Sequence, residues 1–396
     1  MRLLFVTDAR SPISRNWMRY FAERGDEVFV ASTFDCELDF PAARLEITPA
    51  AFSGMKKADS PPSSASSRTL GLRTRIRQWL GPLTIPASAR KLRAFIKEVQ
   101  PDLVHAMRVP YEGMLAAAAL ARGFDMSGKN ARSTQPPRFL VSIWGNDFTL
   151  HAPSTPLMRM YTRKTMRAVD ALHADTERDV RLAREWGLGV DKLTLVAPGG
   201  GGVRSGIFFP PNELVKEPVI INPRGVRPYV RNDSFFKAIP LVLEKRSDAK
   251  FLCSSMQGER QAEAWVRELG IESAVELMPP VPFAEMGNVF RRAQIVVSPS
   301  VHDGTPNSLI EAMACGCFPI AGDLESIREW ITHAHNGLLV DATDPQSIAD
   351  AILLGLERED LRREAAGLNA EMISARAEYG RTMERVTEFY KSMMRL

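Results

Sequence analysis

The stretch from Ser298 to Ala321, SPSVHDGTPNSLIEAMACGCFPIA, constrains the fold more than any other part of the chain. Residues 294–297 precede it and are mostly β-branched, which is typical of a buried strand. A turn-rich loop follows, in which Thr305 suits a helix N-cap and Pro306 the first helical position. Gly316 is expected to end that helix, and the last four residues predict another strand. The stretch therefore predicts the strand, helix and strand of a parallel α/β sheet.

The loop and helix of this stretch also predict a binding site. The amides of Asn307, Ser308 and Leu309 would lie at a helix N-terminus, where they can hold an anion such as a diphosphate. Two carboxylates, Asp303 and Glu311, bracket the loop. Because carboxylates repel phosphates, we expect them to face neutral sugar and ribose hydroxyls. The alternative is an ordinary capped helix in an α/β sheet.

These residues resemble the nucleotide-sugar signature of glycosyltransferase family 4, whose members are retaining enzymes with the GT-B fold. The signature has an acidic residue, a glycine-containing loop and then Glu-Ala-Met-Ala-x-Gly, here residues 311–316. The family usually has Glu at the first acidic position, and this chain has the shorter Asp303. The resemblance makes Asp303 a catalytic candidate and implies a set of donor-binding residues, namely Gly304, Thr305, Pro306, Asn307, Ser308, Leu309 and Glu311.

The composition suits a large enzyme without a membrane span. The chain has 396 residues, of which 45% are hydrophobic and 25% charged, enough to bury two cores. No apolar run approaches the roughly 20 residues that cross a bilayer, and the N-terminus turns polar too soon for a signal peptide. We therefore expect a cytoplasmic protein, with peripheral attachment to the inner face of the membrane as a refinement. Cys315 and Cys317 lack metal-ligand spacing, and no metal is expected.

The N-terminal segment predicts a second doubly wound sheet. Leu3–Val6 and Val28–Ala31 are expected strands that flank a helix over Ser14–Glu23. The loop after the first strand contains no glycine, which excludes the phosphate cradle of an NAD site and argues against an oxidoreductase. This opening resembles the acceptor-side domain of the same glycosyltransferase family.

The sequence Pro101-Asp102-Leu103-Val104-His105 resembles a strand of that family that ends at the active site. The resemblance implies that His105 binds the acceptor or the donor sugar through a neutral imidazole. The alternative is a histidine that forms a structural hydrogen bond at the strand end.

A further strand, Phe139–Ile143, leads into Trp144-Gly145-Asn146-Asp147, and relatives often have a similar pattern there. Polar residues beyond the carboxyl end of a parallel strand are where such sheets bind ligands. Trp144, Asn146 and Asp147 are therefore acceptor-binding candidates, and Asp147 could accept a hydroxyl proton. The alternative for Asp147 is a helix cap.

A basic loop follows the expected strand Val219–Ile221. Relatives place an Arg and a Lys there, both on the donor diphosphate. Arg224 matches the Arg, but no Lys is present, so Arg227 or Arg231 would supply the second charge. A solvated basic loop is the alternative.

The expected architecture is α/β, a GT-B fold of two Rossmann-like doubly wound domains that face each other across a cleft. The Pro-rich stretch 210–218 is the predicted boundary. We expect an acceptor-binding domain at 1–210, a nucleotide-sugar-binding domain at 217–378, and a helix at 379–396 that crosses back to the first domain.

The resemblance implies retaining transfer of a sugar from a UDP- or GDP-sugar to a hydroxyl acceptor. A lipid-linked or cell-surface glycan precursor, as in polysaccharide biosynthesis, is the expected acceptor. The helix N-terminus and arginines would replace a metal at the leaving diphosphate, so no cofactor is expected. The alternatives are a catalytically silent nucleotide-sugar-binding or scaffold protein, and a phosphorylase or epimerase of the same fold. Three features favour the silent protein: the missing Lys, Asp303, and Met107 at a position where many relatives have a second His.

Residues 56–97 are strongly basic, with a single acid, Asp59. Leu70, Leu72, Ile76, Trp79 and Leu80 are interleaved with the arginines, as in an interfacial helix. The pattern predicts docking on an anionic membrane; the alternative is a solvated loop and a core-facing helix. Nucleic acid is not expected, since flanking aromatic platforms are lacking. The ten basic residues are Lys56, Lys57, Arg68, Arg73, Arg75, Arg77, Arg90, Lys91, Arg93 and Lys97.

Overall fold

A computed structural model describes residues 1–53, 76–121, 123–126, 135–213 and 215–395. The chain divides into two compact units, each described here by itself. Unit 1 comprises Met1–Gly201 and Thr382–Leu396, and unit 2 comprises Gly202–Arg381. The division thus falls at Gly202 rather than within residues 210–218, because Val203 is already tied to unit 2: its amide donates to the carbonyl of Ala377.

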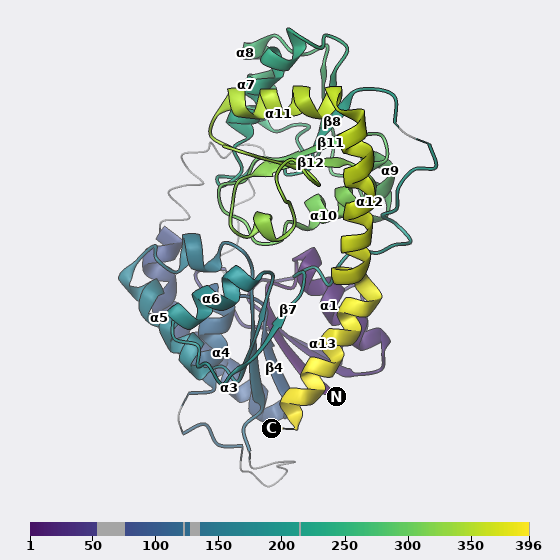
Figure 1. Ribbon diagram of the computed structural model, residues 1–396. Helices are drawn as coiled ribbons and strands as arrows, with labels where there is room; N and C mark the ends of the chain where they lie inside the picture. The colour runs from purple at the N-terminus through teal and green to yellow at the C-terminus, as the bar shows by residue number, and fades with distance from the viewer. Residues whose placement is uncertain (54–75, 122, 127–134, 214, 396) are drawn as a thin grey trace. The chain divides into compact units, whose positions relative to one another are not determined.

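Unit 1 contains one parallel seven-stranded sheet in the order β3-β2-β1-β4-β5-β6-β7 (Figure 1). The predicted strands Leu3–Val6, Val28–Ala31 and Phe139–Ile143 all lie within it. Most of its strands are buried on both faces, as parallel sheets usually are. The strands are β1 Arg2–Thr7, β2 Glu27–Ser32, β3 Arg44–Ile47, β4 Leu103–Ala106, β5 Arg138–Ile143, β6 Ala171–Ala174 and β7 Leu193–Val196.

Helices cover both faces of this sheet. Successive side chains of β1 point to opposite faces, and each face packs against different helices. Leu4 and Val6 belong to the cluster formed with α3 and α4, whereas the ring of Phe5 lies against Phe21 of α1. Figure 1 shows α3, α4 and α5 on one side and α1 and α13 on the other. The helical segments are α1 Pro12–Glu23, η2 Gly81–Thr84, α3 Ile85–Val99, η3 Val109–Gly113, α4 Met114–Ala119, η4 Asp147–His151, α5 Pro156–Ala168, α6 Glu177–Glu185 and α13 Tyr379–Met394.

Unit 2 contains one parallel six-stranded sheet in the order β10-β9-β8-β11-β12-β13. The predicted strand, helix and strand around Ser298–Ala321 are present as β11, α10 and β12, with β11 and β12 paired in parallel. The strands are β8 Val219–Asn222, β9 Lys250–Cys253, β10 Val275–Leu277, β11 Ile295–Ser298, β12 Phe318–Gly322 and β13 Leu338–Val340. The helical segments are α7 Asn232–Leu243, α8 Arg260–Leu269, η5 Phe283–Glu285, α9 Met286–Phe290, α10 Asn307–Ala314, η6 Ile327–Glu329, α11 Pro345–Glu357 and α12 Glu359–Arg376.

The strand orders confirm two Rossmann-like, doubly wound units. In each, the order reverses beside the first strand, between β1 and β4 in unit 1 and between β8 and β11 in unit 2. Such sheets bind ligands beyond the carboxyl ends of the strands at this switch point. The loops after β8 and β11 are therefore where a ligand of unit 2 is expected.

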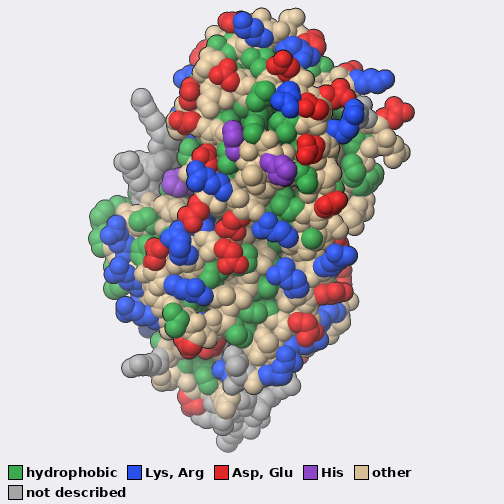
Figure 2. Space-filling view, in the orientation of Figure 1, with side chains coloured by type: hydrophobic (Ala, Val, Ile, Leu, Met, Phe, Trp, Pro, Cys, Tyr) green, Lys and Arg blue, Asp and Glu red, His purple; other side chains and the backbone are tan. Residues whose placement is uncertain are grey.

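The surface seen in Figure 2 carries basic and acidic side chains interspersed with one another. This agrees with the nearly balanced composition of 51 Lys and Arg against 47 Asp and Glu. Among the described residues, none of the helices combines the length and the apolar character that a bilayer crossing requires.

Candidate functional site

The N-terminus of α10 is open toward the switch point of unit 2. The helix begins at Asn307 with Pro306 as its N-cap, one residue later than predicted, and no side chain of the described residues caps it. Thr305 lies one residue before the cap position, and its hydroxyl accepts a hydrogen bond from the indole of Trp330, at 2.9 Å. The Leu309 amide donates to the carbonyl of Pro306. Of the three predicted amides, those of Asn307 and Ser308 thus remain open for an anion.

Arg224 and Asp303, predicted to contact different parts of the donor, form an ion pair. Arg224 Nη2 lies 2.6 Å from Asp303 Oδ2, and the two side chains are only 10% and 15% exposed. The Arg224 amide donates to Asn222 Oδ1, and the Ser326 hydroxyl donates to the backbone carbonyl of Asp303. Arg224 Nε is buried and has no hydrogen-bond partner within the described part of the chain. The pair therefore holds one edge of the guanidinium and leaves another edge free for a ligand.

The loops after β8 and β11 are joined by backbone contacts. Val230 forms a bridge with Ser300, and the Arg231 amide donates to the carbonyl of Pro299. The side chain of Arg231 is engaged by Asp233 through two hydrogen bonds of 2.8 and 2.7 Å. Arg227 is exposed and contacts the hydroxyl of Tyr229, at 3.1 Å. Arg227 is therefore the more available second cation of this loop.

Glu311 lies on α10 without a hydrogen bond to its carboxyl from the residues that the structure describes. The residue keeps part of its surface exposed, yet burial of the carboxyl raises its pKa to about 7. A carboxyl without donors in such a position is ready to accept hydrogen bonds from ligand hydroxyls. Gly304, the remaining predicted donor residue, is buried and donates its amide to Asp303 Oδ1 at 3.2 Å.

The acceptor candidates of unit 1 gather where β4 and β5 end. Asp147 is fully buried: Arg108 Nη2 lies 2.9 Å from one oxygen, and the amides of Val109 and Trp144 donate to the other. Burial raises the pKa of this carboxyl, although the charge of Arg108 opposes the shift. Asp147 thus connects the loop after β5, in which it lies, to the loop after β4, which contains Arg108 and Val109. Asn146 accepts a long hydrogen bond of 3.5 Å from Arg108.

The guanidinium of Arg108 lies over the Trp144 ring, with Cζ 5.5 Å from the ring centroid. Its indole Nε1 is buried without a hydrogen-bond partner among the described residues. An indole N–H in this position is a donor that a ligand oxygen could satisfy.

His105 is buried, and both its ring nitrogens are occupied. Nδ1 lies 2.6 Å from the hydroxyl of Tyr390, and Nε2 lies 2.7 Å from the hydroxyl of Ser142. Ser142 in turn contacts His173 Nδ1 at 2.9 Å, and His173 Nε2 lies 3.0 Å from the carbonyl of Ala197. This is the geometry of the structural alternative raised above, and it offers no free nitrogen to a substrate.

The donor and the acceptor of each of these hydrogen bonds can be assigned by starting from the carbonyl of Ala197. Because a carbonyl only accepts, His173 Nε2 carries the proton, and His173 Nδ1 accepts from Ser142. Ser142 then accepts from His105 Nε2, and Tyr390 donates to His105 Nδ1. Burial lowers the pKa of His173 to about 4 and holds the pKa of His105 well below its ordinary value, so both imidazoles are neutral near pH 7.

Sequence reasoning missed a strained turn directly after β4. Arg108 and Tyr111 have φ of 143° and 70°, which is uncommon for residues other than glycine. Glu112 in this turn is buried, accepts from Thr33 at 2.8 Å, and has a pKa raised by burial. A signal for this turn is present in the sequence: the charged and aromatic residues Arg108, Tyr111 and Glu112 follow the end of a predicted strand.

The chain matches two glycosyltransferase family models. One, described as glycosyl transferases group 1, matches residues 219–358; the other, a glycosyl transferase 4-like domain, matches residues 11–199. The first covers the signature loop of unit 2, and the second covers the acceptor candidates of unit 1.

The curated relatives that the chain resembles are also named as glycosyltransferases. A D-inositol 3-phosphate glycosyltransferase of Corynebacterium urealyticum is 30% identical over 35% of this chain and 33% of its own length. The enzyme of that name from Corynebacterium glutamicum is 23% identical over 53% of this chain and 54% of its own length. The chain thus spans about a third to a half of the length of these relatives.

Solved structures share the fold over the whole chain. Sucrose-phosphate synthase from Thermosynechococcus elongatus has a TM-score of 0.71 at 15% identity, covering 99% of both chains. Anabaena HepE in complex with UDP-glucose has a TM-score of 0.70 at 13% identity, covering 99% of this chain and 100% of its own. At these identities the likeness shows the fold. The two family models together match most of the chain, which therefore belongs to the group 1 glycosyl transferases, glycosyltransferase family 4.

Proposed function

We propose that the chain transfers a sugar from a UDP-sugar to a hydroxyl acceptor with retention of anomeric configuration. The observation that carries the proposal is the Arg224–Asp303 pair beside the open N-terminus of α10, at the switch point of unit 2. HepE, which shares the fold, was solved with UDP-glucose, and this supports UDP over GDP.

The residues of unit 2 suit a leaving diphosphate. The amides of Asn307 and Ser308, with Arg224 and Arg227, would stabilise the negative charge that grows as the sugar–phosphate bond breaks. These groups would do the work of a metal ion, and the proposal needs no cofactor. Glu311 would accept hydrogen bonds from the ribose hydroxyls, and Asp303 would face the sugar while it holds Arg224.

Retention follows if the acceptor hydroxyl attacks from the face that the diphosphate leaves. The bond from the anomeric carbon to the phosphate oxygen breaks, and a bond to the acceptor oxygen forms. The departing phosphate takes the acceptor proton, so the chain needs no nucleophile of its own.

The acceptor would bind unit 1 at Trp144, Asn146 and Asp147. Because the Asp147 carboxyl is already bonded by Arg108 and two amides, its role would be to position the loop rather than to take a proton. The curated relatives are named for a phosphorylated cyclitol, which supports a polyhydroxylated acceptor. A lipid-linked glycan precursor is the form we favour because of the surface described next.

Four large apolar side chains are exposed within residues 76–83 of unit 1. Ile76, Trp79, Leu80 and Leu83 have exposed fractions of 46%, 58%, 47% and 63%. The core-facing alternative for Trp79 is therefore wrong. Arg90 and Lys91 of α3 follow within eight residues and are exposed, as an anionic membrane surface would require. Residues 54–75, which contain five of the ten basic residues of the predicted membrane-docking region 56–97, lie outside the described residues.

The function is tested by incubating the purified chain with UDP-, GDP- and ADP-sugars, with and without hydroxyl acceptors, and measuring release of the nucleotide. We expect acceptor-dependent UDP release, lost in Arg224→Ala and kept in Arg292→Ala, since Arg292 lies outside the donor site and is exposed. Tight binding of a nucleotide sugar without transfer or hydrolysis under any condition would instead support the catalytically silent protein.

A further inference from the structure

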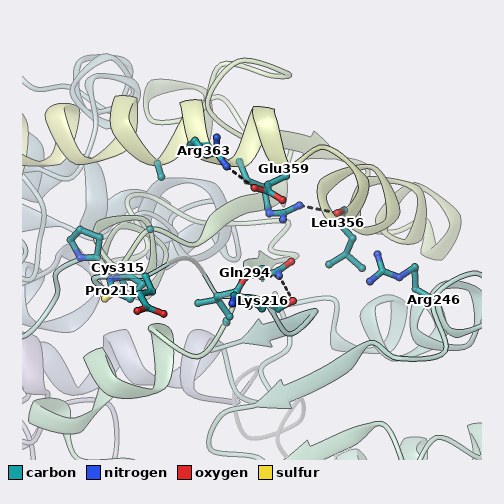
Figure 3. A pocket seen from close by; sticks show the side chains of 15 residues that line it. Pro211, Lys216, Arg246, Gln294, Cys315, Leu356, Glu359 and Arg363 are labelled. Atoms are coloured by element: carbon teal, nitrogen blue, oxygen red, sulfur yellow. Dashed lines mark hydrogen bonds and ion pairs between the residues drawn. The ribbon is translucent and has the colours of Figure 1, made fainter.

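A pocket of unit 2 lies at the opposite edge of the sheet from the donor candidates. It has a volume of about 490 Å³ and is lined by residues that precede the strands, such as Lys216 before β8, Arg246 before β9 and Gln294 before β11. Arg362 and Arg363, near the start of α12, complete its wall (Figure 3). None of the donor or acceptor candidates lines this pocket.

The lining carries more positive than negative charge. Lys216, Arg246, Arg362 and Arg363 stand against two acids of the lining, Glu213 and Glu359. Glu359 is committed to Arg363, whose Nη2 lies 2.6 Å away, as the dashed line in Figure 3 shows.

Among the residues that the structure describes, the neighbours of two of the arginines hold them on one edge only. Asp248 binds Nε and Nη2 of Arg246, each at 2.9 Å, and leaves Nη1. Arg362 donates Nη1 to the carbonyls of Gly355 and Leu356 and leaves Nε and Nη2. Burial lowers the pKa of Arg362; the charge of Glu359 opposes this shift, and the charge of Arg246, which repels that of Arg362, adds to it.

The rest of the wall is compact and uncharged. Leu356, Pro211 and Ala366 contribute apolar surface, and burial raises the pKa of the Cys315 thiol to about 12, so it carries no charge. The side-chain amide of Gln294 donates to the carbonyls of Val215 and Lys216 and fixes the connecting segment against the sheet. The cations therefore converge on a pocket of the size that small ligands occupy.

We propose that this pocket binds a small phosphate-bearing anion at a site separate from the nucleotide-sugar site. The free edges of Arg246 and Arg362 can each offer N–H groups to phosphate oxygens, and Lys216 adds a third charge. An anion between the two arginines would remove their mutual repulsion, and its binding would stabilise unit 2.

The test is isothermal titration of inorganic pyrophosphate into the full-length chain. The donor site would also hold pyrophosphate, so Arg224→Ala serves as the parent. In that parent we expect binding to persist and to weaken at least tenfold when Lys216→Gln and Arg246→Gln are added. Arg292→Gln, which removes one positive charge from an exposed ion pair outside the pocket, is the control and should leave the affinity unchanged.

Three results would overturn the proposal: no pyrophosphate binding to the Arg224→Ala parent, binding unaffected by the pocket substitutions, or equal weakening by Arg292→Gln. Arg246→Lys, which keeps the charge beside Asp248, guards against a folding defect and should restore part of the affinity. Titration of UDP into Lys216→Gln/Arg246→Gln on the wild-type background reports the donor site separately. That affinity should not change, so failure of this proposal and failure of the proposed function give different results.

Discussion

Asp303 and Arg224 show how a single contact changes the interpretation of two residues. From the sequence, one faced the sugar and the other the diphosphate, but their side chains form one ion pair in a mostly buried position. A ligand phosphate would compete with Asp303 for Arg224 or share it. The two residues are therefore expected to act together.

A double-mutant cycle measures this coupling. Arg224→Ala should weaken UDP binding by roughly 1.5–3 kcal/mol while leaving UMP, which lacks the second phosphate, nearly unaffected. Asp303→Asn should lower transfer more than UDP affinity. In the double variant the effects on UDP binding should differ from the sum by at least about 0.5 kcal/mol. Strict additivity, measured by titration calorimetry, would show that the pair does not act as a unit.

Glu311 predicts a pH dependence that can be followed without any ligand. Its pKa in the folded chain, about 7, lies above the ordinary value of 4.5, so folding favours the protonated form. The stability that this carboxyl contributes is complete below about pH 4.5 and is lost as the pH rises through 7. Glu311→Gln should therefore melt at a higher temperature than the wild type at pH 8 and at nearly the same temperature at pH 4.5.

The same variant should bind UDP more weakly at pH 8, because an amide accepts hydroxyl hydrogen bonds less strongly than a carboxylate. Glu263→Gln, on the exposed face of α8, is the control for loss of one charge. Equal UDP affinity in the wild type and in Glu311→Gln would remove Glu311 from the nucleotide site.

At the scale of elements, α13 is fastened to unit 1 by a buried hydrogen-bond network as well as by apolar contacts. Tyr390 stacks on Phe21 of α1, with ring centroids 4.8 Å apart, and donates to His105 of β4. The network continues through Ser142 of β5 to His173 of β6. One continuous chain of hydrogen bonds thus connects the C-terminal helix to the strands β4, β5 and β6.

Acid should weaken this network. The pKa of His173 is about 4 in the folded chain and near 6.5 when unfolded, so its contribution is complete above pH 6.5 and is lost as the pH falls toward 4. The shift corresponds to about 3 kcal/mol of unfolding free energy. Denaturant unfolding at pH 7 and pH 4.5 checks this, and His173→Gln should reduce the difference between the two.

Tyr390→Phe removes one donor from the network and leaves His105 Nδ1 buried and unsatisfied. We expect a loss of about 1–3 kcal/mol in the unfolding free energy. Tyr161→Phe is the matched control, since the Tyr161 hydroxyl makes no hydrogen bond to the described residues. Should Tyr390→Phe prove as stable as the control, the hydroxyl contributes nothing and the helix is held by packing alone.

At the scale of the whole molecule, the exposed apolar residues of unit 1 predict membrane association. The chain should co-sediment with anionic liposomes at low salt and much less with neutral liposomes or at high salt. Trp79→Ser with Leu83→Ser should abolish the binding, whereas Val190→Ser should not, although Val190 is 86% exposed on the same unit. Absence of binding to anionic liposomes at low salt would contradict the docking proposal and favour a water-soluble acceptor.

The sequence by itself determined the two doubly wound units and the signature segment. Strands such as Ile295–Ser298 are mostly apolar, and a glycine such as Gly316 marks the end of a helix, so local physical chemistry suffices to place these elements. The resemblance at residues 303–316 led to the family that the comparisons establish.

Only the tertiary structure decided what the polar residues contact. Thr305 bonds Trp330 instead of capping α10, His105 is enclosed by Tyr390 from the far end of the chain, and Arg231 is engaged by Asp233 while Arg227 remains exposed. These outcomes depend on hydrogen bonds and ion pairs whose partners, in the first two cases, lie 25 and 285 positions apart in sequence. A pattern of neighbouring residues carries no record of such partners, since they meet only when the sheets form and their side chains are buried.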